Sequence, residues 1–191
     1  QTETHRMQPS LLAALLALAP LAHADDAVWA KLKAGGNVLL IRHASTESGL
    51  GDPPGFKLGD CTTQRNLSET GREEARRLAR QFKFRAINFT TARSSQWCRC
   101  LETARLAFGE EPEPWPVLNS LYAKPEKEFE LIEAVEALAA KVKPPYNAVL
   151  VTHNFNIRAL TGISPSTAEI IVVRGEGGKL EVVGRIPLPA Q

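Results

Sequence analysis

Two short, uninterrupted apolar runs constrain the fold of this chain more than any other feature. Val38–Ile41 follows a pair of glycines, and Ala148–Val151 comes soon after a pair of prolines. Four consecutive apolar residues bounded by such breakers are typical of strands that are buried on both faces of a sheet. Strands of this kind occur mainly in parallel sheets covered by helices, so the two runs predict an α/β fold.

Helical patterns lie between and after the two runs. Thr70 with Glu73 predicts a capping box at the start of the first helix. Apolar residues at helical spacing then cover residues 75–82, 97–108 and 131–142. Further strands are expected over residues 87–91, 169–173 and 180–186. Alternating strands and helices predict a three-layer α/β/α architecture with a mainly parallel central sheet, in a single domain over residues 25–191.

The first 24 residues are set apart from this domain. Residues before Met7 are treated as upstream sequence, and the apolar run Leu11–Leu21 is too short to span a bilayer but suits the core of a secretory signal. Ala22-His23-Ala24 gives a small-x-small cleavage pattern, so the mature chain is expected to start near Asp25. This interpretation predicts a periplasmic or secreted protein without a stable membrane anchor. The alternative is an amphipathic N-terminal helix packed on the domain.

Three cysteines allow three disulfide pairings. Cys98 and Cys100 are two residues apart on a predicted helix, so their side chains point to different sides and should not pair. Cys100 lies on the apolar stripe of that helix, which favours a Cys61–Cys98 disulfide in an oxidising compartment. Without the signal, three reduced cysteines would be an equally good interpretation.

Basic and imidazole side chains follow the predicted core strands. Arg42-His43 comes directly after the first run and Thr152-His153 after the second, and the carboxyl ends of parallel strands form the ligand-binding edge of such a sheet. Arg99 lies in the first turn of a predicted helix, where backbone N–H groups already favour an anion. Arg42 and Arg99 could together give forked hydrogen bonds to phosphate oxygens.

The overall charge of the chain does not favour binding of a large polyanion such as nucleic acid. The net charge is +2, from 23 basic and 21 acidic residues, which gives no general argument for a nucleic-acid partner. A few arginines gathered in one cleft could still bind a small anion. The expected partner is therefore a small phosphorylated substrate.

Four segments, in order along the chain, resemble the motifs of the histidine phosphatase superfamily, the phosphoglycerate mutase-like proteins. They are Leu40–Glu47, Asn66–Ala75, Ser94–Ala104 and Val151–His153. The resemblance implies a phosphoglycerate mutase-like fold and, together with the predicted signal, the exported bacterial phosphatases of that superfamily.

The resemblance also assigns roles to particular residues. It implies that His43 is the nucleophile, that Arg42, Arg99 and His153 bind the transferring phosphoryl group, and that the Thr46 hydroxyl contacts phosphate. No metal or cofactor is implied. The chemistry agrees, because a nucleophilic imidazole must be neutral and neighbouring arginines lower its pKa. A protonated His153 would add another donor.

The pattern departs from the family at the proton donor. The segment Leu118–Leu121 contains no carboxylate where the mutase-like proteins carry a glutamate, and Asn154 stands where the acid phosphatases carry an aspartate. Glu126, Glu128 and Glu130 could fold back as a replacement acid, although surface charge is the simpler interpretation. A missing acid favours an activated substrate, such as a phosphoramidate, acyl phosphate or phosphoanhydride, over a simple sugar monoester.

The main hypothesis is an exported, metal-independent phosphatase that acts through a covalent phosphohistidine on His43. Cell-envelope phosphates, such as those of lipopolysaccharide core sugars, are expected as substrates only by analogy with exported relatives. Two alternatives stay open: a catalytically silent protein that binds phosphorylated ligands, and a cytoplasmic phosphohistidine phosphatase. The glycine-rich segment 49–59 predicts a loop beside the nucleophile that shapes specificity.

Overall fold

The computed structural model describes residues 24–90 and 92–188, so the predicted signal segment lies outside the described residues except for its last one. The helices are α1 (Ala24–Ala34), α2 (Glu69–Arg85), α3 (Cys98–Phe108), α4 (Glu128–Ala139) and α5 (Asn154–Thr161). The strands are β1 (Val38–Arg42), β2 (Arg93–Ser94), β3 (Glu113–Pro114), β4 (Ala148–Thr152), β5 (Ile170–Glu176) and β6 (Lys179–Ile186). Short 3-10 helices are η1 (Cys61–Thr63), η2 (Pro116–Leu118) and η3 (Pro125–Lys127). No helix among these residues is long and apolar enough to span a bilayer.

The strands form one sheet in the order β3-β2-β4-β1-β5-β6. Strands β1 to β4 run parallel to their neighbours in this group, and β5 and β6 are added as an antiparallel hairpin at one edge. The predicted, mainly parallel sheet is thus confirmed. Both apolar runs found in the sequence are central strands, and β1 pairs with β4 in register from Val38 opposite Ala148 to Arg42 opposite Thr152.

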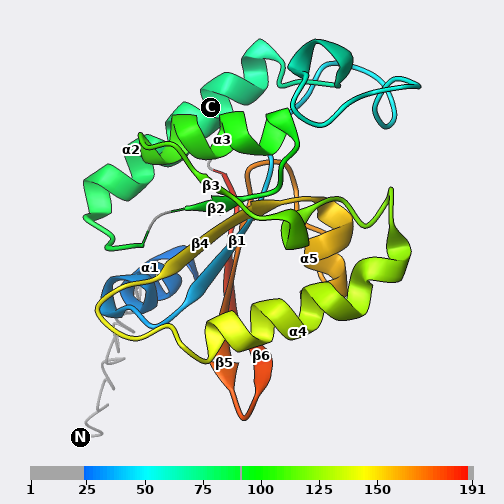
Figure 1. Ribbon diagram of the computed structural model, residues 1–191. Helices are drawn as coiled ribbons and strands as arrows, with labels where there is room; N and C mark the ends of the chain where they lie inside the picture. Colours follow the sequence, from blue (N-terminus) through cyan, green and yellow to red (C-terminus); the bar gives the residue numbers. More distant parts are fainter. Residues whose placement is uncertain (1–23, 91, 189–191) are drawn as a thin grey trace, which may run out of the picture.

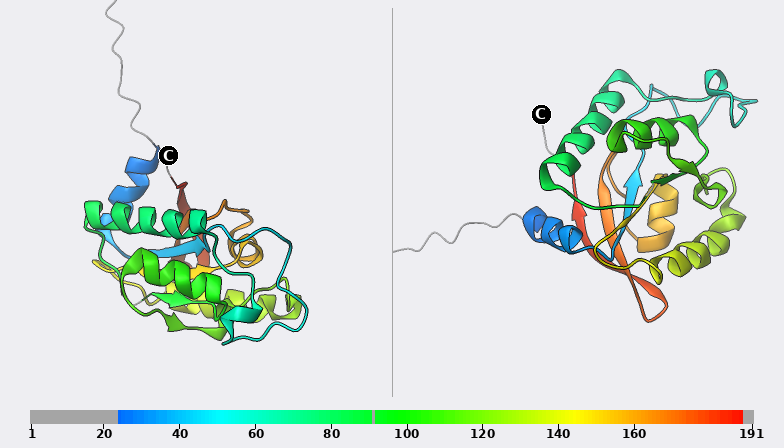
Figure 2. Two further views of the ribbon diagram at one scale, coloured as in Figure 1. Left: turned by 90° about the horizontal axis from the view of Figure 1, so that it is seen from above. Right: turned by 60° about the vertical axis from the view of Figure 1, so that its left-hand side comes forward.

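Helices cover both faces of this sheet and give three layers (Figure 1). Leu39 and Ile41 of β1 are buried against α1, α2 and α3, whereas Val38 and Leu40 of the same strand are buried against α4 and α5. This alternation follows from the period of two along a strand. The two views of Figure 2 show the same arrangement, with residues 49–64 extending from the domain as a long loop.

Two local predictions were wrong. Residues 87–90 contain an isolated bridge from Phe89 to Asn147, and the strand in this region, β2, begins only at Arg93. The apolar character of the segment serves core packing instead, since the Phe89 ring lies 5.0 Å from that of Phe108. The cap of α2 is Ser68, whose hydroxyl accepts a hydrogen bond from the backbone N–H of Gly71, so Thr70 lies within the first turn.

The first turn of α2 packs directly on the segment that follows β1. A Cβ atom added at Gly71 would lie 1.8 Å from the carbonyl oxygen of Ser45, far inside van der Waals contact. Glu74 holds the same segment, because its carboxylate accepts hydrogen bonds from the backbone N–H of Ser45 at 2.7 Å and from the Ser45 hydroxyl at 2.8 Å. The loop that carries His43 is therefore fixed by α2 on one side and by the sheet on the other.

Substituting Gly71→Ala is expected to lower the free energy of unfolding by about 1–3 kcal/mol, the usual range for overpacking. Helix propensity alone predicts the opposite sign, since alanine stabilises a helix interior relative to glycine by roughly 0.5–1 kcal/mol. Urea unfolding of the parent and the variant measures the difference. A variant as stable as the parent, or more stable, would contradict the close approach of α2 to Ser45.

Candidate active site

The structure brings the two predicted histidines together at the carboxyl edge of the sheet. The backbone N–H of His43 donates to the carbonyl of Thr152 at 2.9 Å, which continues the β1–β4 pairing past the end of both strands. The imidazole rings of His43 and His153 lie 5.4 Å apart between centroids, edge to face. Both side chains are buried.

The hydrogen bonding of His43 defines which ring nitrogen is available for chemistry. Nδ1 lies 2.9 Å from the carbonyl oxygen of Ala44, which can only accept, so Nδ1 carries the proton. The lone pair is then on Nε2. Burial, together with the charges of Arg99, Arg42 and Arg65, lowers the pKa of His43 to about 3, although the backbone hydrogen bond acts to raise it. His43 is therefore a neutral imidazole with a nucleophilic Nε2 at physiological pH.

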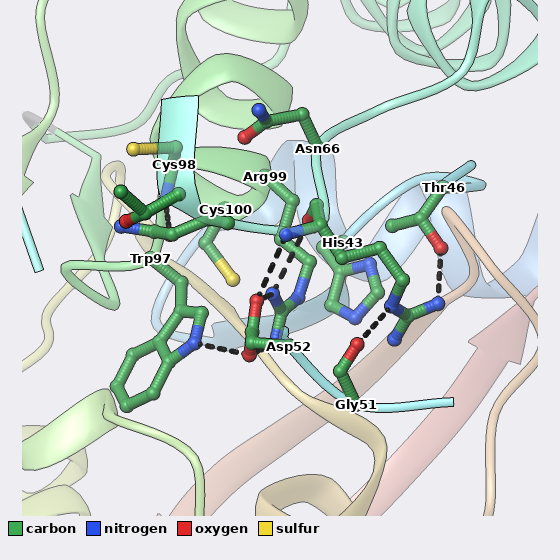
Figure 3. Close-up of polar contacts among 12 residues, drawn as sticks. His43, Thr46, Gly51, Asp52, Asn66, Trp97, Cys98, Arg99 and Cys100 are labelled. Atoms are coloured by element: carbon green, nitrogen blue, oxygen red, sulfur yellow. Dashed lines mark hydrogen bonds and ion pairs between the residues drawn. The ribbon is translucent and has the colours of Figure 1, made fainter. Parts of the chain in front are cut away.

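Arg99, in the first turn of α3, is held by a carboxylate that sequence reasoning missed. Its Nη1 and Nη2 donate to Oδ1 and Oδ2 of Asp52 at 2.8 and 3.3 Å, and both side chains are buried. The indole N–H of Trp97 donates to the same carboxylate at 2.9 Å. Figure 3 shows Asp52 between Trp97 and Arg99, with the His43 ring beside the guanidinium. The end-on pairing fixes the orientation of the guanidinium plane.

Both predicted phosphate-binding arginines keep one buried donor free. The Nε atoms of Arg42 and Arg99 are buried and have no hydrogen-bond partner in the described part of the chain. Each guanidinium is anchored through other nitrogens, Arg42 by a 2.8 Å bond to the carbonyl of Pro165 and Arg99 by Asp52. Unpaired buried donors are costly and rare in folded proteins, so these two N–H groups are suited to bind an anion.

Arg65 is a third arginine of this site and was not expected from the sequence. Its Nη1 donates to the hydroxyl of Thr46, and its Nε donates to the carbonyl of Gly51 at 2.9 Å. Its charge contributes to lowering the pKa of Arg42 and of both histidines. In the sequence, the one local indication that Arg65 belongs to the site is its position directly before the Asn66–Ala75 motif. Thr46 accepts this hydrogen bond from Arg65, and the contact of its hydroxyl with phosphate stays a prediction.

The predicted disulfide ties the loop with Arg65 to the helix with Arg99. Cys61 and Cys98 are bonded, with 5.7 Å between their Cα atoms. The backbone N–H of Cys98 also donates to the side-chain carbonyl of Gln64 at 3.0 Å. These two links hold the residues just before Arg65 against the start of α3. The prediction of Cys61–Cys98 is confirmed, with Cys100 left as a buried thiol.

His153 is held by a polar network with Ser95 and Asn119. Its Nε2 lies 2.8 Å from the Ser95 hydroxyl, which is in turn 3.3 Å from the side-chain carbonyl of Asn119. Burial, followed by the charges of His43 and Arg99, lowers the pKa of His153 well below its ordinary value. His153 is therefore a neutral imidazole here, whereas a protonated donor had been considered from the sequence. Burial also raises the pKa of the neighbouring Cys100 thiol to about 12, so that it stays protonated.

The glutamates considered as replacement acids remain on the surface. Glu126, Glu128 and Glu130 are exposed, and Glu130 forms an ion pair with Lys127. The carboxylate that pairs with Arg99 is that of Asp52. Although its burial acts to raise the pKa of Asp52, hydrogen bonds from Arg99 and Trp97 hold that pKa below its ordinary value. Asp52 is therefore an ionised partner of Arg99 and, in this state, not a proton donor.

The site places two neutral imidazoles, His43 and His153, beside guanidinium groups that are suited to bind an anion. A family model described as the histidine phosphatase superfamily (branch 1) matches residues 38–122, which include Arg42, His43 and Arg99. Residues 38–122 of the chain are therefore similar to the histidine phosphatase superfamily. A comparison with curated protein sequences gave no significant match.

Solved structures of low sequence identity share the fold. The protein histidine phosphatase SixA complexed with tungstate matches with a TM-score of 0.58 and 16% identity, over 79% of this chain and 96% of SixA. The open reading frame Rv3214 from Mycobacterium tuberculosis matches with a TM-score of 0.60 and 19% identity, over 78% and 95%. Phosphoserine phosphatase from Entamoeba histolytica, in complex with 3-phosphoglyceric acid, gives 0.56 and 17%, over 78% and 95%.

Substituting Asp52→Asn is expected to have two opposite effects. The variant leaves the buried Arg99 charge uncompensated, and breaking a buried ion pair costs about 3–5 kcal/mol, so its melting temperature should fall. The same uncompensated charge should make added inorganic phosphate stabilise the variant more than it stabilises the parent.

Thermal unfolding with and without phosphate measures both effects. Asp60→Asn is the matched control, because Asp60 lies in the same loop and its carboxylate accepts hydrogen bonds from Thr62 at an exposed position. Equal phosphate stabilisation of the parent and Asp52→Asn would show that the Asp52 carboxylate does not act on the anion site.

The depressed pKa of His43 predicts that stability is lost in acid. The unfolded chain binds a proton at this residue near pH 6.5, whereas the folded chain does so only near pH 3. Between these values the unfolded state binds more protons, so the free energy of unfolding should fall as pH drops below 6.5. Urea unfolding of the parent and His43→Gln at pH 7.5, 6 and 5 tests this. The variant should lose less stability over the range, and identical losses would contradict the buried neutral imidazole.

Proposed function

We propose that this protein is a phosphatase that transfers a phosphoryl group to Nε2 of His43 and then to water. The observation that carries the proposal is the placement of a neutral imidazole, with its lone pair on Nε2, beside two arginines whose buried Nε–H groups are unpaired. The match of residues 38–122 to the histidine phosphatase superfamily supports a phosphatase activity. The phosphorylated ligands named for fold relatives point in the same direction.

The first step would form a P–N bond between phosphorus and Nε2 of His43 while the bond from phosphorus to the leaving group breaks. The electron pair of that bond goes to the leaving atom. The N–H donors of Arg42 and Arg99 are suited to bind the equatorial oxygens, where charge accumulates during an in-line transfer. The Nδ1–H bond to the Ala44 carbonyl would stabilise the positive charge that the imidazole acquires.

The second step would return His43 to its starting form. Water attacks phosphorus, the P–N bond breaks, and its electron pair returns to Nε2 as inorganic phosphate leaves. His153 lies next to His43 and is oriented by Ser95, so it is placed to contact the phosphoryl group in both steps. We propose that no metal takes part, because Arg42, Arg65 and Arg99 supply the positive charge that a cation would otherwise provide.

The proposed substrates are activated phosphates. A positioned acid typically accelerates the departure of a poor leaving group by roughly 10²–10⁴-fold, and the carboxylate nearest the arginines, Asp52, is ionised. A phosphoramidate, an acyl phosphate or another substrate with a stable leaving group has less need of that acid. Cell-envelope phosphates remain the expected source if the protein is exported.

Export itself is part of the proposal. The Cys61–Cys98 disulfide is compatible with an oxidising compartment such as the periplasm, where such bonds persist. Val28 and Trp29 of α1 are buried in the core, so a mature chain beginning near Asp25 would retain the whole packed domain. A cytoplasmic phosphohistidine phosphatase would have to keep both cysteines reduced and would lose this link next to Arg99.

Turnover by the purified chain from Asp25 tests the proposal. With a chelator present, we expect release of inorganic phosphate from acetyl phosphate and from a phosphoramidate, faster than from glucose 6-phosphate. His43→Ala should reduce the rate at least 10³-fold, since it removes the nucleophile. Phe84→Ala changes an exposed position on α2 and is the control variant, whose rate should equal that of the parent. Turnover that persists in folded His43→Ala, or that requires added metal, would contradict the mechanism.

A further inference from the structure

We infer that Tyr122 and Phe155 form a subsite for the leaving group and select aryl phosphates, an inference that rests on the proposed phosphatase function. Both rings are exposed, Tyr122 to 70% and Phe155 to 42%. Their centroids lie 5.5 Å apart with a 40° angle between the planes. Two aromatic side chains packed on each other and open to solvent form a surface on which a third ring can stack.

The pair lies beside the phosphate site. Phe155 is in the first turn of α5, two residues after His153. Tyr122 follows the segment after η2 that contains Asn119, the residue bonded to the Ser95 hydroxyl next to His153. The backbone N–H of Leu121 donates to the buried side chain of Asn156 at 3.0 Å, which holds this segment on α5.

Tyr122 also faces the loop that carries Asp52. A Cβ atom at Gly51 would lie 3.9 Å from Cε1 of Tyr122, and the Gly51 carbonyl accepts the hydrogen bond from Arg65. Gly51 therefore lies between the aromatic pair and the arginines. Its own carbonyl contacts Arg65, and the next residue, Asp52, contacts Arg99. A substrate whose phosphate reaches His43 would place its leaving group near these rings.

A charged side chain borders this aromatic surface. The guanidinium of Arg158 lies 5.6 Å from the Phe155 ring centroid and so places a positive charge at one end of the surface. An apolar, planar leaving group fits this combination better than a sugar, which would have to desolvate its hydroxyl groups.

The chemistry of the site favours the same class of substrate. When the P–O bond of an aryl phosphate breaks, its electron pair goes to a phenolate oxygen, and the P–N bond to His43 forms. A phenol has a pKa near 10, as the tyrosine side chain does, so phenolate can leave without a proton and take one from solvent afterwards. The ionised state of Asp52 beside Arg99 and the presence of exposed rings therefore both favour aryl phosphates.

Steady-state kinetics on three substrates tests the inference. Acetyl phosphate is activated but lacks a ring, phenyl phosphate has one, and 2-naphthyl phosphate has a larger ring with a similar leaving-group pKa. The parent should prefer 2-naphthyl to phenyl phosphate. In Tyr122→Ala and Phe155→Ala, the ratio of kcat/KM for phenyl phosphate to that for acetyl phosphate should fall roughly threefold each, and about tenfold in the double variant, mostly through KM.

Phe84→Ala is a matched control, because Phe84 is also exposed and has an arginine guanidinium 5.7 Å from its ring, but lies near the far end of α2. Its substrate ratio should equal that of the parent. An unchanged ratio in the double variant, with acetyl phosphate still turned over, would overturn the subsite and leave the phosphatase intact. Failure of the parent to turn over acetyl phosphate would instead contradict the proposed function.

A binding measurement keeps the inference testable without turnover. Phenylphosphonate and methylphosphonate are not hydrolysed and differ in the ring. The parent should bind phenylphosphonate with about tenfold lower Kd, and the double variant should bind the two equally. Equal affinities in the parent would contradict the subsite whatever the kinetics show.

Discussion

In-register pairing of β1 with β4 is the constraint on which the rest of the site depends. Because Arg42 lies opposite Thr152, the residues that follow the two strands leave the sheet at the same level, and His43 and His153 meet edge to face. A slip of one residue would turn the alternating side chains of β1 to the opposite layers, so the packed cores on both faces fix this register. The position of the nucleophile is therefore a consequence of core packing.

The second requirement is that several cations lie close together in a buried region. Desolvation and mutual repulsion oppose this arrangement, and the chain offsets them with neighbouring groups. Asp52 neutralises Arg99, the Pro165 carbonyl holds Arg42, and the Gly51 carbonyl holds Arg65. Burial and these cations together keep His43 neutral, which a nucleophilic imidazole requires. The carboxylate and the two carbonyls thus stabilise the buried arginines, and the arginines in turn help to keep His43 neutral.

How much the sequence could predict depended on how local each signal was. The two core strands, the helical stripes and the edge with both histidines follow from short apolar runs and their flanking residues. The disulfide followed from the positions of the cysteines together with the predicted export. Asp52 and Arg65 were missed because both lie in the largely irregular segment between β1 and α2, whose conformation no local sequence pattern indicates. The contact between Asp52 and Arg99 joins residues 47 positions apart, and no local pattern indicates it. The strand expected at 87–91 was wrong because its apolar residues pack in the core without pairing in a ladder.

The most direct measurement of the central claim is detection of the phosphoenzyme. The protein would be mixed briefly with acetyl phosphate, quenched in alkali, digested and examined by mass spectrometry. The account predicts an alkali-stable, acid-labile phosphate on the peptide that contains His43, absent when His43 is replaced by alanine. Phosphate release with no such intermediate, or a phosphoryl group on His153 or another residue, would contradict it.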